Sequence, residues 1–262
     1  MKEECVSSLM PVLFIGHGNP MNAIEDNEWS RAWADAAAAL PLPRAVLCVS
    51  AHWETRGVLV TAMERPRTIH DFYGFPPELF AMRYRAPGSP EIAETVRAAA
   101  RSAEVSPDLQ WGLDHGAWSV LSRMFPKADV PVVQLSLDST RPVEFHYELG
   151  RELGKLREEG ILILGSGNMV HNLALADFSA TGAYDWAQSF DGKLAEWIAS
   201  GNHQPVIRWN EQGRDALLSV NSAEHYKPLL YVLGLQRKEE PVSFFAASMV
   251  AGSLSMRCVR IG

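Results

Sequence analysis

Residues 11–20 of the chain read PVLFIGHGNP, and they decide how the rest of the sequence is organised. The four apolar residues 12–15 predict a short buried strand, which ends at Gly16-His17-Gly18. The two glycines leave the backbone free to turn and leave space around the imidazole of His17. Because ligands bind in the crevice at the carboxyl ends of strands in an open α/β sheet, we expect His17 to lie in a functional site.

The same arrangement recurs twice along the chain. Residues 45–50 (AVLCVS) lead into His52, and residues 161–165 (ILILG) lead into His171. Three hydrophobic runs that each deliver a histidine beyond their end predict one shared site at one edge of one sheet. Converging neutral imidazoles suit either metal binding or acid–base catalysis, and the spacing alone leaves both open.

Strands alternate with helices along the chain, which predicts an α/β fold with a largely parallel or mixed central sheet flanked by helices. The long stretch 64–89, rich in proline, glycine and aromatic residues, predicts a functional loop. No linker divides the sequence, so we expect one catalytic domain over residues 1–262, with a metal site at the carboxyl ends of the strands. Further strands are expected at 57–62, 130–137 and 253–261, and helices at 27–40, 90–101, 116–125, 142–159, 185–200 and 223–232.

The composition argues against several classes of protein. A formal charge of −7 without any basic run argues against nucleic-acid binding. The N-terminus lacks the pattern of a signal peptide, and no run approaches the roughly 18 apolar residues of a membrane helix, so we expect a cytoplasmic protein without membrane contact. Cys5, Cys48 and Cys258 lack metal-type spacing, and two of them lie in apolar runs, so buried reduced thiols are expected. The oligomeric state stays open.

Common catalytic and nucleotide-binding motifs are missing from the sequence. Gly165-Ser166-Gly167 lacks the first glycine of a GxSxG nucleophile elbow, because residue 164 is leucine. The chain also has no GxGxxG or Walker A sequence. These patterns argue against a serine hydrolase and give no support to nucleotide binding.

Two further histidines are candidates for the same site. Ser222 is expected to cap a helix and to place His225 in its first turn, where the positive helix end keeps the imidazole neutral for a metal. A solvent-facing His225 fits the spacing equally well. His115 beside Asp114 suits an oriented acid or base, although Asp114 also suits a helix cap that leaves His115 without a role.

The other three histidines carry weaker signals. His70 lies in the aromatic loop, where it would either bind a substrate or hold the loop in place. His146 lies on the flank of a predicted amphipathic helix and His203 lies in a polar turn. Neither His146 nor His203 is expected to bind a metal.

Taken together, these stretches resemble the class III extradiol ring-cleavage dioxygenases, and within them the 4,5-DOPA extradiol dioxygenase branch of bacteria and plants. The resemblance extends over nearly the whole chain, and the joint order and spacing of its segments are specific. The segments are GHGNPMNA (16–23), SAHW (50–53), TIHDFYGFP (68–76), YRAPGSP (84–90), WGLDHGAW (111–118), VQLSLD (133–138), SGNMVHNL (166–173), EHYKPLLYVLG (224–234) and GSLSMR (252–257).

The resemblance implies a divalent metal at the strand ends and cleavage of a catechol ring beside its hydroxyl groups with O₂. His17, His52, His171 and His225 match the metal-site histidines of the branch. In better-studied members of the class, two histidines and a carboxylate hold iron, and histidines corresponding to His171 and His115 act beside the metal. His171 and His115 are therefore the expected acid–base residues, and whether His171 also binds the metal stays open.

The chain departs from those members at one ligand. His225 stands where they have a glutamate, and the neighbouring Glu224 would point about 100° away from it on a helix. Four nitrogen donors favour zinc, with one ion per subunit. Chemistry with O₂ instead requires Fe(II), because zinc has no redox chemistry.

The expected substrates are O₂ and a small catechol with an amino-acid-like side chain, such as 4,5-DOPA. A zinc-dependent hydrolase of amides or esters, with Glu54 as its base, is one alternative. The other is a non-enzymatic protein whose closed zinc site is required for folding. Five residues are expected to surround the substrate: His70, Trp53, Phe72, Tyr73 and Phe75.

Overall fold

The strand predicted near the start of the chain lies inside the central sheet. The structure, a computed structural model, describes residues 9–180 and 182–262. Strand β1 (Val12–Gly16) is fully buried between β6 (Ile161–Gly167), which is parallel to it, and β10 (Cys258–Ile261), which is antiparallel. Val12 and Leu13 belong to different hydrophobic clusters, one on each face of the sheet. A strand buried on both faces needs the continuous apolar sequence found here.

Eight strands form a mixed sheet within the described residues, and the four strands β5 (Val132–Asp138), β2 (Ala45–Thr55), β6 and β1 at its centre are parallel. Their carboxyl ends therefore meet along one edge, as expected for an α/β fold. Strands β8 (Met249–Val250) and β9 (Leu254–Ser255) form a separate small sheet. The order of the large sheet is β4 (Val105–Asp108), β3 (Val58–Thr61), β5 (Val132–Asp138), β2 (Ala45–Thr55), β6, β1, β10 and β7 (Val242–Phe245).

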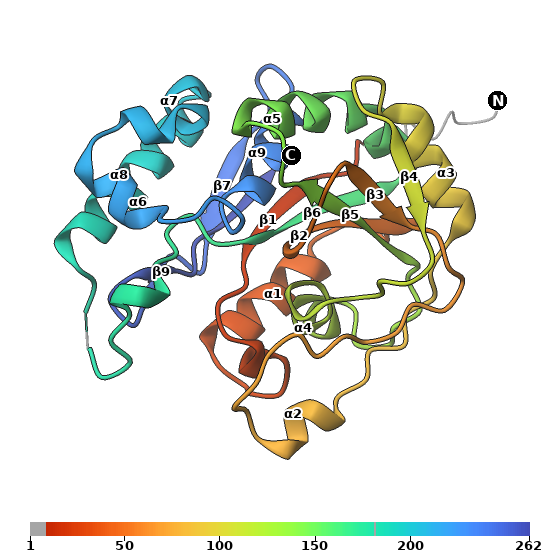
Figure 1. The fold of residues 1–262 in the computed structure, drawn as a ribbon, viewed down its shortest axis with the longest axis horizontal. Coiled ribbons are helices and arrows are strands. Elements are labelled where there is room, and N and C mark those ends of the chain that lie inside the picture. The colour runs from red at the N-terminus through yellow and green to blue at the C-terminus, as the bar shows by residue number, and fades with distance from the viewer. Residues whose placement is uncertain (1–8, 181) are drawn as a thin grey trace.

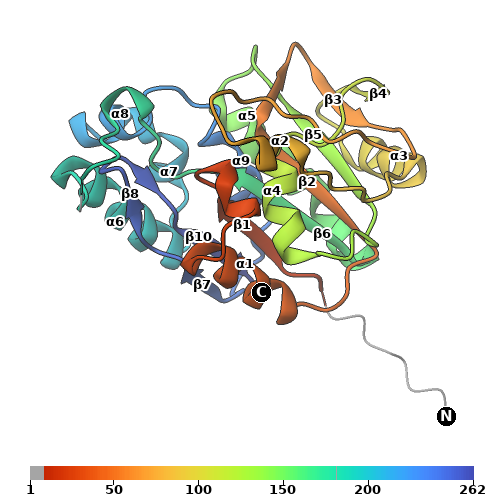
Figure 2. The ribbon, with the colours of Figure 1, turned by 90° about the horizontal axis from the view of Figure 1, so that it is seen from below.

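Helices cover both faces of the sheet, which gives the expected three layers (Figure 1). The helices α1 and α4 pack with one hydrophobic cluster, and α3, α5 and α9 pack with the other. The helices α6 and α8 contact each other at one end of the molecule, on the left of both views (Figures 1 and 2). The helices are α1 (Glu28–Ala38), α2 (Pro77–Ala81), α3 (Pro90–Ala99), α4 (His115–Met124), α5 (Val143–Glu152), α6 (Asp185–Ala199), α7 (Gln204–Ile207), α8 (Arg214–Ser219) and α9 (Lys227–Gly234), with 3₁₀ helices η1 (Pro20–Ala23), η2 (Leu153–Glu159), η3 (Leu173–Leu175) and η4 (Trp209–Glu211).

Local capping signals set several helix ends. The predicted start of α3 is confirmed, because the Ser89 side chain accepts the N–H of Ile92 and Pro90 occupies the first helical position. Asn27 caps α1 in the same way, in a reciprocal capping box with Ser30. The predicted end at Gly160 is also confirmed, since its φ of 74° lies in the left-handed region.

Three predicted elements have different bounds in the structure. Strand β2 continues to Thr55, with a register shift against β5, so His52 lies inside the strand and beyond the last residue that pairs with β6. The helix expected over 142–159 changes from α to 3₁₀ geometry at Leu153. The strand expected over 253–261 is interrupted at residues 256–257, and its two halves join different sheets. Short elements such as β4, β7 and α2 were not predicted, because a few residues carry no clear periodicity.

The prediction for the helix that carries His225 is wrong. Helix α9 begins at Lys227, and Ser222 does not cap it; its hydroxyl donates to Glu224 instead. The backbone N–H groups of Tyr226 and Lys227 both donate to Ala223, which closes a turn before the helix. His225 therefore lies in this turn and not in a helix.

Cys48 and Cys258 are buried free thiols, as predicted, and Cys5 lies outside the described residues. Burial raises the pKa of both thiols. Within the described ranges, no helix combines the length and apolarity needed to cross a bilayer.

Candidate metal centre

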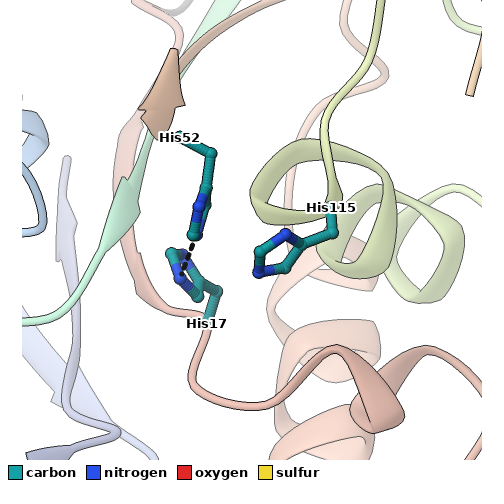
Figure 3. Close-up of side chains that lie close together, drawn as sticks. All are labelled: His17, His52 and His115. Atoms are coloured by element: carbon teal, nitrogen blue, oxygen red, sulfur yellow. Dashed lines mark hydrogen bonds between the residues drawn. The ribbon is translucent and has the colours of Figure 1, made fainter. Parts of the chain in front are cut away.

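Five histidines from separate parts of the chain meet at the carboxyl edge of the parallel strands. The ring centroids of His17 and His52 are 5.0 Å apart, and those of His52 and His115 are 3.8 Å apart. Figure 3 shows these three side chains pointing toward one another. His225 lies 5.3 Å from His17, and it stacks on His171 at 3.6 Å. The structure thus brings together every histidine that the sequence singled out for this site.

The end of strand β1 fixes the ring of His17. Its backbone N–H donates to Gly167 across a 3.0 Å distance, so the chain leaves the sheet alongside β6. The hydroxyl oxygen of Ser166 lies 2.6 Å from the carbonyl oxygen of Gly116 and 2.9 Å from Nδ1 of His17. Because the single hydroxyl proton goes to that carbonyl, Ser166 accepts the Nδ1 proton of His17. The Nε2 lone pair of His17 is therefore free.

His52 faces His17 across a 3.1 Å distance between the two Nε2 atoms (Figure 3). Nδ1 of His52 lies 3.5 Å from Oδ2 of Asp71, which favours the tautomer with its proton on Nδ1. Both rings then direct an unprotonated nitrogen at the same point, an arrangement that a cation stabilises. Since zinc–nitrogen bonds are about 2.0–2.1 Å long, two nitrogens at this separation fit one shared ion.

Asp114 places His115 at the first position of α4. Its carboxylate accepts the N–H of Ala117 at the helix start, the hydroxyl of Ser50 and the side-chain amide of Gln134, at 3.1, 2.7 and 2.7 Å. Burial raises the pKa of Asp114, and these hydrogen bonds oppose the rise. Asp114 caps the helix, as one alternative predicted, and this cap also holds His115 among the other histidines.

Asp71 is a residue of the site that sequence reasoning missed. Its Oδ1 accepts the backbone N–H of His115 at 2.9 Å, and its Oδ2 lies 3.0 Å from Nδ1 of the same residue and 3.5 Å from Nδ1 of His52. Burial would raise the pKa of Asp71, but its contacts with His115 outweigh burial and lower it. The one available signal was its place beside His70 in the aromatic loop, and a single aspartate forms no pattern.

His171, Glu224 and His225 form a second group of ligand atoms within 4.8 Å of one another. Oε1 of Glu224 lies 3.0 Å from Nδ1 of His225, which places the proton on Nδ1 and leaves Nε2 free. The rings of His171 and His225 are stacked with only 6° between their planes. Burial would raise the pKa of Glu224, but the hydrogen bond from His225 outweighs it and lowers the pKa to about 2.

Gly167 allows the turn that carries His225 to approach the end of β6. The N–H of Asn168 donates to the carbonyl oxygen of His225 at 2.9 Å. A Cβ atom at Gly167 would collide with that oxygen. Glycine is therefore required here by a close backbone approach, and it helps to place His225.

Burial lowers the pKa of three histidines of the cluster, His17, His52 and His171. It is the largest of the effects that lower the pKa of His17 and His52, and the neighbouring histidines lower both further. Burial, followed by the proximity of His225, lowers the pKa of His171 to about 3. Neutral imidazoles are the form that binds metals and accepts protons.

A cavity of about 370 Å³ opens over the cluster, and all five histidines line it. This volume suits a small ligand. Phe72 and Phe75 of the aromatic loop also line the cavity, and the ring of Phe72 meets that of His115 edge-on at 5.5 Å. Sequence analysis missed the rest of the apolar wall, which includes Trp29, Leu173, Phe178, Leu254 and Met256.

Three residues expected at the substrate are not part of the cavity lining. Trp53 is buried against Trp111, with parallel rings 5.5 Å apart, because successive side chains of a strand point to opposite sides and His52 takes the inward side. Tyr73 is 91% exposed. His70 lies with Nε2 3.1 Å from the carbonyl oxygen of Met82, and this contact holds the loop.

The remaining candidate residues lie away from the cluster. His146 is fully buried beside the hydroxyl of Tyr231, and burial lowers its pKa to about 3. His203 contacts the hydroxyl of Tyr147. Glu54, the base of the hydrolase alternative, pairs with the ammonium of Lys227 at 2.7 Å and does not line the cavity.

Comparison with protein families matches residues 11–251 to the family described as the catalytic LigB subunit of aromatic ring-opening dioxygenase. Among curated proteins, the chain is similar to a protein of Escherichia coli (strain K12) named 4,5-DOPA dioxygenase extradiol. The two are 45% identical over 98% of this chain and 96% of the relative. A Beta vulgaris protein of the same name is 35% identical over 95% of each chain.

The fold has a close counterpart among solved structures. A crystal structure of an uncharacterized protein from Escherichia coli K12 superposes with a TM-score of 0.85 and 42% sequence identity. The match covers 97% of this chain and 100% of that one.

Proposed function

Because the chain belongs to the family of the catalytic LigB subunit of aromatic ring-opening dioxygenases, we propose that it is an extradiol dioxygenase that uses O₂ to open a catechol ring beside its two hydroxyl groups. The proposed substrate is a catechol with an amino-acid-like side chain, such as 4,5-DOPA. Similar proteins from a bacterium and a plant, both named 4,5-DOPA dioxygenase extradiol, support this class of substrate.

One observation carries the proposal. The Nε2 atoms of His17 and His52 face each other at 3.1 Å, while the opposite nitrogens face Ser166 and Asp71. Two free lone pairs at this distance repel one another unless a cation lies between them. A cation-binding pair beside an open, largely apolar cavity is what ring-opening chemistry requires.

The third proposed ligand is His225, whose Nδ1 contacts Glu224 and whose Nε2 is free. His171 stacks face to face on His225, and a lone pair lies in the plane of its own ring. Two parallel rings 3.6 Å apart therefore cannot both direct lone pairs at one ion. This geometry favours His225 as the ligand and leaves His171 for proton transfer.

His17, His52 and His225 would hold a divalent ion, which when bound would lower the pKa of the catechol hydroxyl groups and supply the electron transfer from the catechol to O₂. We propose Fe(II) for this role, because the reaction needs a redox-active metal. Zinc suits the same nitrogen donors and is the ion expected to compete for them during purification.

The chain's own residues then position the ring and move protons. Phe72 and Phe75 form an aromatic wall beside the cluster, against which the catechol ring would pack. Neutral His171 would accept a catechol hydroxyl proton, since its low pKa keeps its lone pair available. His115, fixed by Asp71 on its Nδ1 side, would supply a proton to the oxygen atom released when the O–O bond breaks.

The test is anaerobic reconstitution of metal-free protein with Fe(II), followed by O₂ uptake with DOPA, caffeate and protocatechuate. We expect uptake with a yellow ring-cleavage product from DOPA, the catechol with an amino-acid side chain, and no uptake by the zinc-loaded protein. Absence of uptake with every catechol, together with amide or ester hydrolysis by the zinc form, would replace the dioxygenase with a hydrolase. His203→Ala serves as a control for histidine loss outside the cluster, and it should leave uptake unchanged.

A further inference from the structure

Glu25 is one of the residues that line the proposed catalytic cavity. Its backbone is firmly held: its N–H donates to Met21 at 2.9 Å, and its carbonyl oxygen accepts from Ser30 and Arg123 at 2.9 and 2.8 Å. The side chain is exposed, and among the described residues its carboxylate has neither a hydrogen-bond nor an ion-pair partner. A fixed backbone therefore presents an unpaired negative charge to the cavity.

The cavity lining has a negative side chain, Glu25, without a lysine or arginine beside it among the described residues. Apart from the histidines, Glu25 is the one residue with an ionisable side chain among the described residues that line the cavity, and this described lining contains no lysine or arginine. A carboxylate on the ring substituent of a bound catechol would thus meet the like charge of Glu25, with no lysine or arginine side chain of the described lining to neutralise it.

The guanidinium of Arg123, which contacts the backbone of Glu25, does not change this balance. Arg123 donates to the backbone carbonyl oxygens of Asn22 and Glu25, at 3.0 and 2.8 Å, and it is not a lining residue. It forms no ion pair with the Glu25 carboxylate within the described part of the chain. Trp29, which also lines the cavity, donates its indole N–H to Ser248, so its ring face is what remains for a ligand. An aromatic face attracts cations.

We propose that Glu25 makes this cavity selective for catechols whose ring substituent carries an ammonium group, and against catechols whose substituent carries only a carboxylate. The inference rests on the proposed dioxygenase function and names its substrate class. The catechol oxygens would face the histidine cluster, while the charged end of the substituent would face Glu25 and the ring of Trp29. Arylethylamines and aromatic amino acids fit this arrangement, and cinnamate-type or benzoate-type catechols do not.

The experiment compares four catechols that differ in the charge of the ring substituent. They are dopamine (cationic), DOPA (zwitterionic), 3,4-dihydroxyphenylpropionate (anionic) and 4-methylcatechol (neutral). For the Fe(II)-loaded protein we measure kcat/KM by O₂ uptake. For the zinc-loaded protein under anaerobic conditions we measure Kd by calorimetry, which needs no turnover. The variants are Glu25→Gln, Glu25→Lys and, as a control, Asp26→Asn, an exposed neighbouring acid that does not line the cavity.

We expect the wild-type protein to prefer the cationic to the anionic catechol. Glu25→Gln should reduce that ratio roughly three- to tenfold, the size of a partly solvated charge pair, and Glu25→Lys should reverse it. The kcat/KM for neutral 4-methylcatechol should be the same in the wild-type protein and in the Glu25 variants. The Asp26→Asn protein should show the same cation-to-anion ratio as the wild-type protein. The preference should shrink in about 0.5 M salt, because exposed charges are screened.

The outcomes separate this inference from the proposed function. If the wild-type protein turns over 4-methylcatechol and Glu25→Gln leaves the cation-to-anion ratio unchanged, the role of Glu25 is wrong and the dioxygenase stands. If no catechol is turned over, the proposed function fails. An unchanged ratio of Kd values in the zinc-loaded Glu25→Gln protein would then overturn the charge selectivity as well.

Discussion

The two halves of the histidine cluster are held in different ways. His17 directly follows the buried strand β1, and His52 lies in β2 just beyond its last pair with β6, where Ser166 and Asp71 fix the orientation of each ring. His171 lies in the connection after β6 and His225 lies in the turn between α8 and α9, and they are ordered by stacking on each other and by Glu224. The strand-end half is fixed by the sheet, whereas the loop half depends on contacts between loops.

This difference separates two kinds of residue in the proposed site. In the proposed site the strand-end pair binds the metal, and we expect it to tolerate no change, because its nitrogens converge from a rigid frame. The loop pair combines a ligand with a proton acceptor, and its stacking depends on how closely the turn at residues 223–226 approaches β6. Variants of each half therefore test whether the two halves contribute differently to metal binding and to turnover.

The largest effect is expected from His17→Ala in the strand-end half. Because Nε2 of His17 is half of the facing nitrogen pair, its removal should lower metal affinity more than about 100-fold, beyond the 10–100-fold cost of losing a supporting residue. Metal content after dialysis measures this, with His203→Ala as the control. Wild-type metal content in His17→Ala would show that the histidines do not share one ion.

Asp71→Asn should affect turnover next most strongly. The amide keeps an acceptor for the backbone N–H of His115 but loses the charge beside Nδ1 of His115 and His52. We expect kcat to fall about 10–100-fold, with a smaller change in KM. A drop in melting temperature with unchanged kcat would instead make Asp71 a purely structural residue of the loop.

Gly167→Ala tests the loop half. The new methyl group would push the carbonyl oxygen of His225 away from β6, which should cost about 1–3 kcal/mol of stability and should also weaken metal binding. Gly192→Ala in helix α6 meets no atom within 4 Å and should stabilise the protein by up to about 1 kcal/mol. Denaturant unfolding and metal titration of both variants make the comparison. Unchanged metal affinity in Gly167→Ala would mean that His225 is not a ligand.

The smallest effect is expected on the pH dependence of stability, and it comes from His146, a buried histidine outside the cluster. Burial lowers the pKa of His146 to about 3 in the folded protein, below the usual 6.5, so the unfolded chain takes up a proton first as the pH falls. Its contribution to stability is thus complete above pH 6.5 and is lost as the pH falls toward 3. Between pH 7 and 5.5 the wild-type protein should lose on the order of 1 kcal/mol more stability than His146→Gln. Parallel pH curves for the two proteins would contradict this.

Local patterns in the sequence determined the strand-end half of the site. The apolar run before Gly16 and the run that begins at Ala45 predicted buried strands, and parallel strands necessarily bring their carboxyl ends to one edge. The cap at Ser89 and the helix end at Gly160 were predicted for the same reason, since each depends on neighbouring residues alone. The sequence could predict that His17 and His52 lie close together, because each follows an apolar run and parallel strands of one sheet end at the same edge.

Tertiary structure decided the rest, because contacts between loops leave no periodic signal. The turn around His225 was predicted as a helix from Ser222, but backbone contact with β6 and the side chain of Glu224 hold it as a turn. Asp71 and Glu25 lie in irregular segments, and only the folded chain brings one to His115 and the other to the cavity. The sequence determined which histidines meet, and the packing of loops against strand ends decided what surrounds them.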